Sequence, residues 1–226
     1  MPAYAVIGAQ WGDEGKGKVV DFLSQGSQCV VRYAGGSNAG HTVMNESGEF
    51  RLHLVPSGIF WPHTFCVIAS GVVVDPDVLI EELQYLETQS VSTDRLYVSE
   101  RAHVIMPYHI LLDELEERSR GADAIGTTGR GVGPAYVDKT SRIGIRMGDL
   151  LDTDSLLLKL KQVLEFKNKL VTKVYGGKTL SLDEIYDNCV SWAKRLQGHI
   201  RPTQPVIEQV LGGQGKILLE GAQGTM

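Results

Sequence analysis

The sequence has few of the features that mark secreted, membrane-bound or metal-clustered proteins. Its 226 residues include only three cysteines, Cys29, Cys66 and Cys189, which are far apart and form no C-x-x-C pair. This pattern is typical of reduced, buried thiols. Glycines and charges begin within roughly ten residues of Met1, too early for the apolar run of a signal peptide. No stretch is long and apolar enough to span a bilayer, so the sequence predicts a cytoplasmic protein.

Positive charge is also scarce. Lysine and arginine number 22 against 27 aspartates and glutamates, which gives a net charge of −5 and an isoelectric point near 5.7. Nucleic acids and anionic membrane surfaces are held by a basic field, so this composition argues against both as partners. Small anionic ligands are compatible with it, because backbone amides and a few local lysines can bind them.

Short apolar runs alternate with helical patterns along the chain. Strands are expected at 4–8 (buried), 28–33, 65–69, 96–98 and 216–219, and helices at 19–23, 76–88, 107–120, 153–173, 181–197 and 205–211. The turn composition of 45–48 indicates a hairpin between 42–44 and 50–54. This alternation favours an α/β fold, a P-loop-like, largely parallel central sheet with helices on both faces. Residues 122–149 show no clear period and are expected to form a long functional loop.

The chain is interpreted as a single α/β nucleotide-binding domain over 1–226, with a helical subdomain at 150–200 that carries no site candidates. The domain is expected to be incomplete at its C-terminus. The sequence stops just after the core strand expected at 216–219, and a domain rarely ends at the active end of such a strand.

The first candidate site is the loop Gly12-Asp13-Glu14-Gly15-Lys16-Gly17-Lys18, which has the G-x-x-x-x-G-K spacing of a phosphate-binding loop. Its amides, the following helix N-terminus and its lysines would all attract phosphate. A glycine-rich turn with solvated lysines is the alternative. Val19 stands where an ordinary phosphate loop has Ser or Thr to hold magnesium. Asp13 is unusual beside phosphates unless a cation or a proton transfer needs it, and one carboxylate with phosphate oxygens would suffice for Mg²⁺.

A second glycine-rich loop, 35–42, contains Asn38, His41 and Thr42. The Asn38 amide can donate and accept hydrogen bonds, and His41 can donate a proton or neutralise developing charge near neutral pH. An isolated histidine is more often structural. The position of this one in a second glycine loop, at the same expected end of the sheet, favours a functional role.

Two further segments complete the set. Residues 126–136, followed by Asp138, Lys139 and Arg142, combine threonine hydroxyls and arginines among glycines, which suits a phosphate monoester. A solvated basic loop is the alternative. Residues 220–224 place Gln223 after the last expected strand, at the carboxyl end of the sheet where ligands of open α/β folds bind.

Together these segments resemble the adenylosuccinate synthetase family in residues, order and spacing. The matching residues are Gln10 to Lys18, Asn38 to Thr42, Gly126 to Tyr136 with Asp138 and Lys139, and Glu220 to Thr225. The resemblance covers the whole chain. Chains of that family are nearly twice as long, so the sequence is similar to their N-terminal half.

The resemblance implies a GTP-dependent ligation of L-aspartate to IMP in purine biosynthesis. GTP phosphorylates the 6-oxygen of IMP, and the aspartate amino group then displaces phosphate to give adenylosuccinate, GDP and phosphate. Asp13 would be the general base, His41 would stabilise the transferring phosphoryl group or act as an acid, and Gln223 completes the implied catalytic set. Asp13 and the Gly40 carbonyl would hold the Mg²⁺ cofactor.

The same resemblance assigns the ligand contacts. Those to the GTP phosphates would come from Gly12, Asp13, Glu14, Gly15, Lys16, Gly17, Lys18, Gly40, His41 and Thr42. Those to IMP would come from Asp13, Glu14, Gly15, Lys16, Asn38, Ala39, Gly40, His41, Thr128, Arg142 and Gln223. Arg142 would reach IMP from the other subunit of a homodimer. The residues that recognise guanine and aspartate would lie beyond Met226.

Two other functions are considered. A GTP-binding switch would read guanine with an Asn-Lys-x-Asp motif, but here Asn168-Lys169-Leu170 is followed by Val171. A degenerate, non-catalytic scaffold is disfavoured because Asp13, His41 and Gln223 are all present. Binding of IMP would separate a ligase from a GTP switch.

Overall fold

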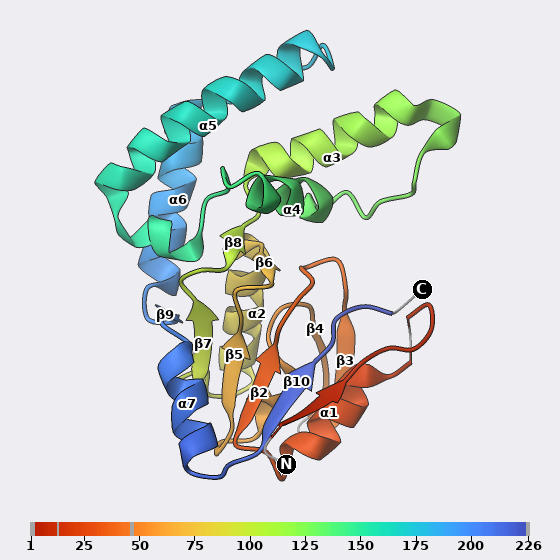
Figure 1. Cartoon of the computed structure of the whole chain (residues 1–226), viewed down its shortest axis with the longest axis vertical. Coiled ribbons are helices and arrows are strands. Elements are labelled where there is room, and N and C mark those ends of the chain that lie inside the picture. The colour runs from red at the N-terminus through yellow and green to blue at the C-terminus, as the bar shows by residue number, and fades with distance from the viewer. Residues whose placement is uncertain (1–2, 13, 46–47, 225–226) are drawn as a thin grey trace.

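The computed structural model describes residues 3–12, 14–45 and 48–224, and is built around one six-stranded sheet (Figure 1). Every strand pairing within this sheet is parallel. In spatial order the strands are β1 (Ala3–Val6), β10 (Ile217–Glu220), β2 (Cys29–Arg32), β5 (Phe65–Ile68), β7 (Leu96–Ser99) and β9 (Ile200–Arg201). The predicted α/β class with a largely parallel sheet is confirmed.

Two smaller pairings stand outside the main sheet. The predicted hairpin is confirmed as antiparallel β3 (His41–Asn45) and β4 (Gly48–Leu52). The short strands β6 (Val73–Val74) and β8 (His103–Val104) pair in parallel.

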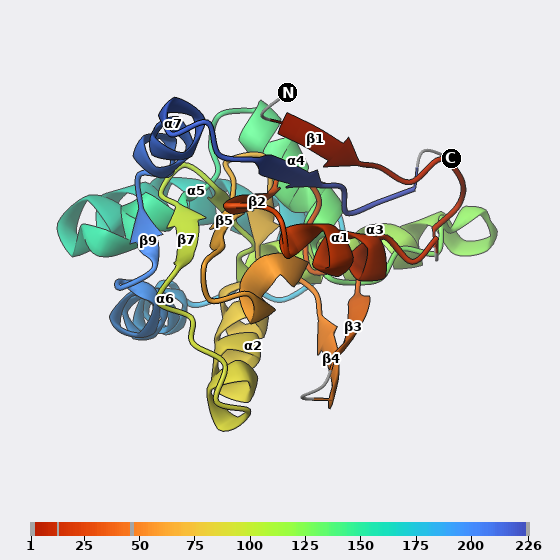
Figure 2. The ribbon, with the colours of Figure 1, turned by 90° about the horizontal axis from the view of Figure 1, so that it is seen from below.

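Helices cover both sides of the sheet. Figure 2 shows α1 and α2 on one side and α7 on the other, while α3, α4 and α5 lie beyond the carboxyl ends of the strands in Figure 1. The α-helices are α1 (Lys16–Ser24), α2 (Pro76–Thr88), α3 (Pro107–Arg120), α4 (Val132–Thr140), α5 (Thr153–Lys173), α6 (Leu182–Leu196) and α7 (Gln204–Gly212). Three 3₁₀ turns are η1 (Ser57–Phe60), η2 (Gly121–Asp123) and η3 (Met147–Leu151).

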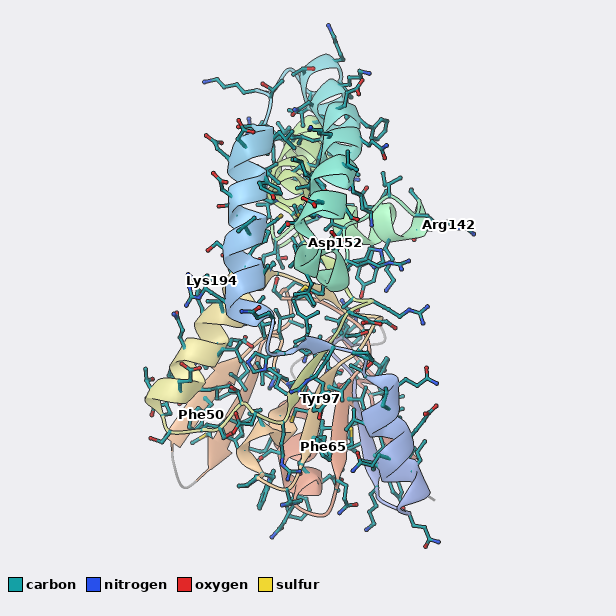
Figure 3. All side chains as sticks on the ribbon, turned by 90° about the vertical axis from the view of Figure 1, so that its left-hand side faces the viewer. Phe50, Phe65, Tyr97, Arg142, Asp152 and Lys194 are labelled. Atoms are coloured by element: carbon teal, nitrogen blue, oxygen red, sulfur yellow. The ribbon has the colours of Figure 1, made fainter. Side chains whose placement is uncertain are left out.

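The central strand β2 is buried on both faces, as a parallel strand between two helical layers should be. Val30 packs with Val20 of α1 on one face, whereas Cys29 and Val31 belong to the cluster that includes Val206 of α7 on the other. Phe65 of β5 and Tyr97 of β7 extend this second face, with their rings 5.8 Å apart edge to face (Figure 3). Cys29, Cys66 and Cys189 are buried, as predicted, and none of them forms a disulfide; their reduced state stays a prediction.

The expectation of a buried first strand is wrong. Ala3, Tyr4 and Ala5 are all exposed, and Tyr4 is 52% exposed. The reason is that β1 forms an edge of the sheet and pairs only with β10. A β-branched and aromatic pattern indicates a strand, but it does not say whether that strand lies at the centre or the edge.

The expectation of a structureless segment at 122–149 is also wrong, because α4 and part of η3 lie within it. Gly133 and Pro134 conceal the helical pattern of α4, but Pro134 stands in the first turn, where its missing N–H costs nothing. By contrast, α2, α3 and α5 begin and end at the predicted residues. The separate status of the helical subdomain at 150–200 stays a prediction.

Candidate functional site

The strand order brings three of the four candidate segments to one place. Strand β10 lies between β1 and β2, with Val6, Glu220 and Arg32 at corresponding positions at the ends of the three strands. Because the strands are parallel, the loops that follow them leave the same edge of the sheet. The described residues of these loops are 7–12 with 14–15, 221–224 and 33–40, and they overlap the candidate segments 12–18, 220–224 and 35–42.

The three loops touch each other at glycines. A Cβ added to Gly224 would lie 2.2 Å from the carbonyl oxygen of Gln10, and one added to Gly35 would lie 2.5 Å from the Cβ of Ala222. Gly35 also has a φ of 94°, which favours glycine. The absent side chains therefore allow the three loops to converge.

A cavity of about 790 Å³ opens between these loops. This volume is within the range of small-molecule sites. Its lining includes every described residue that the resemblance assigns to GTP or to catalysis, together with Trp11, Arg32, Glu220, Gly221, Ala222 and Gly224. Of the described IMP candidates, Thr128 and Arg142 are absent from the lining.

The first loop turns into α1 at Gly15, whose φ of 74° is left-handed, and the helix begins at Lys16. The Lys16 ammonium lies 2.6 Å from a carboxylate oxygen of Glu14, and the amides of Gln10 and Gly12 donate to the other oxygen at 3.2 and 3.4 Å. The hydrogen bond from Lys16 is the largest cause that lowers the pKa of Glu14 to about 2. Glu14 is therefore an anion held by a lysine and two backbone amides of the first loop.

His41 begins β3 directly beside the start of α1. A Cβ added to Gly17 would lie 2.8 Å from the Cβ of His41, so the helix and the hairpin approach as closely as glycine permits. The His41 side chain is 9% exposed and its Nε2 has no hydrogen-bond partner among the described residues. Burial lowers the pKa of His41, and the ring is therefore neutral at neutral pH.

Two buried charges at the cavity were not identified as site residues from the sequence. Arg32 and Glu220 are each about 2% exposed, and Nη1 of Arg32 lies 3.1 Å from Oε1 of Glu220. The available sequence signal was a charge of opposite sign at the end of each of two apolar strands, Cys29–Arg32 and Ile217–Glu220. That signal indicates an ion pair only when the two strands are known to be neighbours in the sheet.

The segment at 126–136 supports the second loop. Arg130 donates to the Ser37 carbonyl at 2.7 Å, and the Tyr136 hydroxyl accepts from the Gly35 amide and donates to the Gly71 carbonyl, both at 2.9 Å. Thr128 lies on an exposed part of this segment. The segment thus packs against the cavity's second loop.

Asp138, Lys139 and Arg142, which follow 126–136, do not line the cavity. Asp138 is buried and pairs with Lys167 of α5 and, at 2.9 Å, with His109 of α3. Lys139 donates to the Ser70 carbonyl at 2.6 Å. Arg142 follows the end of α4 with a φ of 62° and is exposed, its side chain pointing outward in Figure 3. Its predicted role across a dimer interface stays a prediction.

Asp13 lies outside the described residues, so its predicted roles as base and magnesium ligand have no structural account. Among the residues the structure describes, no three His, Cys, Asp or Glu side chains gather as a metal site would require. Gly40 lines the cavity, where its carbonyl is the kind of hard oxygen donor that Mg²⁺ prefers. In the described part of the chain, no helix has the length and apolar character needed to cross a membrane.

Comparisons with known proteins give one consistent result. The family model described as adenylosuccinate synthetase matches residues 5–226. The adenylosuccinate synthetases of Dehalococcoides mccartyi and Desulfitobacterium hafniense are 53% and 54% identical over 226 residues, which is 100% of this chain and 53% of each relative. A solved structure of fully ligated adenylosuccinate synthetase from Plasmodium falciparum is 33% identical with a TM-score of 0.85, and the match covers 97% of this chain and 51% of that one. The chain therefore spans about half the length of the relatives it matches.

Proposed function

The chain belongs to the adenylosuccinate synthetase family, and from that premise we propose that it carries the phosphate-transfer half of a GTP-dependent ligase. The ligase joins L-aspartate to IMP in the biosynthesis of AMP. The observation that carries the proposal is the convergence of three family segments on one cavity at the carboxyl ends of β1, β10 and β2.

The proposed reaction has two steps. In the first, the proton on N1 of IMP is removed and the 6-oxygen attacks the γ-phosphorus of GTP, so that GDP leaves and 6-phosphoryl-IMP forms. In the second, the amino group of aspartate attacks carbon 6, and inorganic phosphate leaves with the bonding electron pair. The products are adenylosuccinate, GDP and phosphate.

The GTP phosphates are proposed to bind at the start of α1 and the neighbouring hairpin. The N-terminus of α1 offers free backbone N–H groups and a partial positive charge. Lys16 and Lys18 add full charges, and a bound phosphate would replace Glu14 as the partner of Lys16. Val19, which stands where Ser or Thr would hold magnesium in an ordinary phosphate loop, is exposed on α1. Gly40, His41 and Thr42 would close the other side of the phosphates.

IMP is proposed to lie against the second and third loops. Asn38 and Gln223 line the cavity and can hydrogen-bond the polar edge of a purine. Asp13 is proposed as the base that takes the N1 proton. His41, neutral and with a free Nε2, would donate to the phosphoryl oxygens as negative charge moves onto them. Thr128, and Arg142 of a second subunit, would hold the 5′-phosphate.

Magnesium is the proposed cofactor. Asp13 and the Gly40 carbonyl would hold it beside the GTP phosphates, where it would neutralise charge on the transferring group. Both are oxygen donors, and Mg²⁺ commonly keeps several waters besides one or two protein ligands. The donor set therefore fits this ion.

The test is a calorimetric titration, with IMP, of an enzyme of the relatives' length that carries these residues. We expect binding in the wild type, and an affinity roughly ten- to hundredfold lower in Asn38→Ala if both its hydrogen bonds are lost. Asn168→Ala, which removes an α5 side-chain amide that bonds the backbone of Leu180, is the matched control and should leave IMP affinity unchanged. A chain that binds GTP but not IMP would instead be a GTP switch, and the proposal would be wrong.

A further inference from the structure

We propose that Arg32 and Glu220 are positioning residues that hold the Ala39–His41 segment and the His41 ring in the cavity. The inference rests on the proposed function, because it assigns a purpose to that segment. It goes further because it assigns a role to two buried residues, Arg32 and Glu220, that end the strands β2 and β10.

The pair is built into the sheet itself. Arg32 and Glu220 are register partners on adjacent parallel strands, and both side chains leave the sheet at its carboxyl edge. Oε1 of Glu220 accepts from Arg32 at 3.1 Å, and Oε2 accepts from the Ser57 amide at 2.9 Å. Because the Ser57 amide holds one carboxylate oxygen of Glu220, the other oxygen holds the Arg32 guanidinium in a fixed position.

The two terminal nitrogens of the guanidinium also approach the second loop, while its Nε has no partner among the described residues. Nη2 of Arg32 lies 3.4 Å from the carbonyl oxygen of Ala39, and Nη1 lies 3.5 Å from Nδ1 of His41. Arginine has no acceptor, so this second contact requires His41 to accept at Nδ1. The ring hydrogen of neutral His41 then resides on Nε2, the atom without a partner in the described structure.

Glu220 does not satisfy that hydrogen. Its Oε1 is 3.9 Å from Nε2 of His41, which is beyond hydrogen-bond distance. His41 lines the cavity, and its buried Nε2 has no partner among the described residues, so an oxygen atom of a bound ligand would satisfy it. Arg32 and Glu220 thus orient a donor while leaving it free to act.

Stabilisation of the fold does not by itself explain a buried ion pair such as Arg32–Glu220. Two buried charges lose their hydration, and a pair of apolar residues of similar volume often serves as well. What an apolar pair cannot do is bond Ala39 and His41. A second buried carboxylate, Asp138, pairs with a basic residue and a histidine at a distance from the cavity lining, so its partner Lys167 provides a control.

Two variants separate positioning from stability. Arg32→Lys keeps the charge beside Glu220 but lacks the planar fork that reaches two further acceptors. The double variant Arg32→Met/Glu220→Gln removes both buried charges and keeps a side-chain oxygen that can accept from the Ser57 amide. We expect both to fold with thermal midpoints near the wild type, whereas Lys167→Met, which leaves Asp138 with one partner fewer, should unfold at lower temperature.

Two measurements test the positioning role: hydrogen exchange at 38–42 and the affinity for Mg²⁺·GTP. By hydrogen exchange with mass spectrometry, peptides covering 38–42 should exchange faster in both Arg32 variants, while those covering β5 and β7 stay unchanged. Calorimetric affinity for Mg²⁺·GTP should fall roughly ten- to hundredfold, as for a lost hydrogen bond to a charged group. Lys167→Met should show neither change at temperatures where it is folded.

The outcomes are distinguishable. If the lysine or the double variant keeps wild-type exchange at 38–42 and wild-type affinity, the pair is only structural and the inference is wrong. If the wild type binds neither Mg²⁺·GTP nor IMP, the proposed function fails, and the exchange data still decide whether Arg32 and Glu220 order the segment.

Discussion

Lys16 shows how charges are paired at the cavity. Its ammonium is held at 2.6 Å by Glu14, whose other oxygen accepts from the amides of Gln10 and Gly12. The glycine spacing predicts that Lys16 lies in a phosphate loop. It does not predict that Lys16 pairs with Glu14, because that contact depends on the left-handed turn at Gly15.

Buried charges mark the limit of residue-level prediction. The sequence predicts that His41 lines a site, and the cavity lining includes it. Arg32 and Glu220 are 188 residues apart, and only the parallel register of β2 and β10 makes them partners. Asp138 shows the reverse case, since it lies in a family signature yet pairs with His109 and Lys167.

The prediction at this scale concerns Asp13. In an enzyme of the relatives' length that carries these residues, Asp13→Asn should lower the rate of adenylosuccinate formation roughly a hundred- to ten-thousand-fold, as loss of a general base does. The amide keeps the shape of the side chain but cannot take the proton, so the circular dichroism spectrum should not change. Asp187→Asn, an exposed aspartate on α6, is the control. Near wild-type turnover of folded Asp13→Asn would remove Asp13 from the mechanism.

At the scale of elements, long periodic helices could be predicted to the residue and irregular ones could not. α2, α3 and α5 carry strong apolar periods and, in α2 and α3, a proline in the first turn. α4 contains Gly133 and Pro134, which argue against a helix. Its nine residues give too few apolar positions for the helical period to be recognised. The exposure of β1 could not be predicted either, because strand order is a property of the whole sheet.

The contact between α1 and β3 gives a prediction for two glycines. A Cβ at Gly17 would lie 2.8 Å from the Cβ of His41, whereas one at Gly26 would meet no atom within 4 Å. Gly17→Ala should therefore lower the free energy of unfolding by roughly 1–3 kcal/mol through overpacking, and should also weaken Mg²⁺·GTP binding. Gly26→Ala should change it by less than about 1 kcal/mol. Urea unfolding measures both, and equal effects of the two substitutions would show that the close approach at Gly17 is not a constraint.

At the scale of the molecule, the insertion of β10 between β1 and β2 assembles the site. Glu220 meets Arg32, 188 residues earlier in the sequence, and Val6, still earlier, because three parallel strands end together. The sequence could place each motif at the end of a strand, and the general rule for open α/β sheets then placed the motifs at one edge. The spatial order of the strands had no local signal.

Arg142 gives a prediction about assembly. If Arg142 acts across a homodimer, mixing an inactive Arg142→Leu enzyme with inactive Asp13→Asn should restore activity, since one site of each hybrid has an intact Asp13 and an intact Arg142 from its partner. Its exposure at the end of α4 is compatible with such a role. The control mixes Arg142→Leu with the double variant Asp13→Asn/Arg142→Leu, which leaves no site with an intact Arg142 and should restore nothing. No recovery in the Arg142 mixture after time for subunit exchange would place Arg142 in its own subunit's site or outside any site.

The 226-residue chain by itself should not form adenylosuccinate. It supplies the phosphate loop, His41 and part of the proposed IMP site, but spans 53% of the relatives' length, and the family resemblance places recognition of guanine and aspartate in the remainder. Apolar side chains on β1 and α1 are also uncovered, with Tyr4 52% and Phe22 74% exposed, and we therefore expect low solubility. The assay follows adenylosuccinate from IMP, GTP, Mg²⁺ and aspartate, with the purified Dehalococcoides mccartyi enzyme as the positive control. Turnover comparable with that control would mean that residues 1–226 contain a complete aspartate site, since no ligation can proceed without the amino group that displaces phosphate.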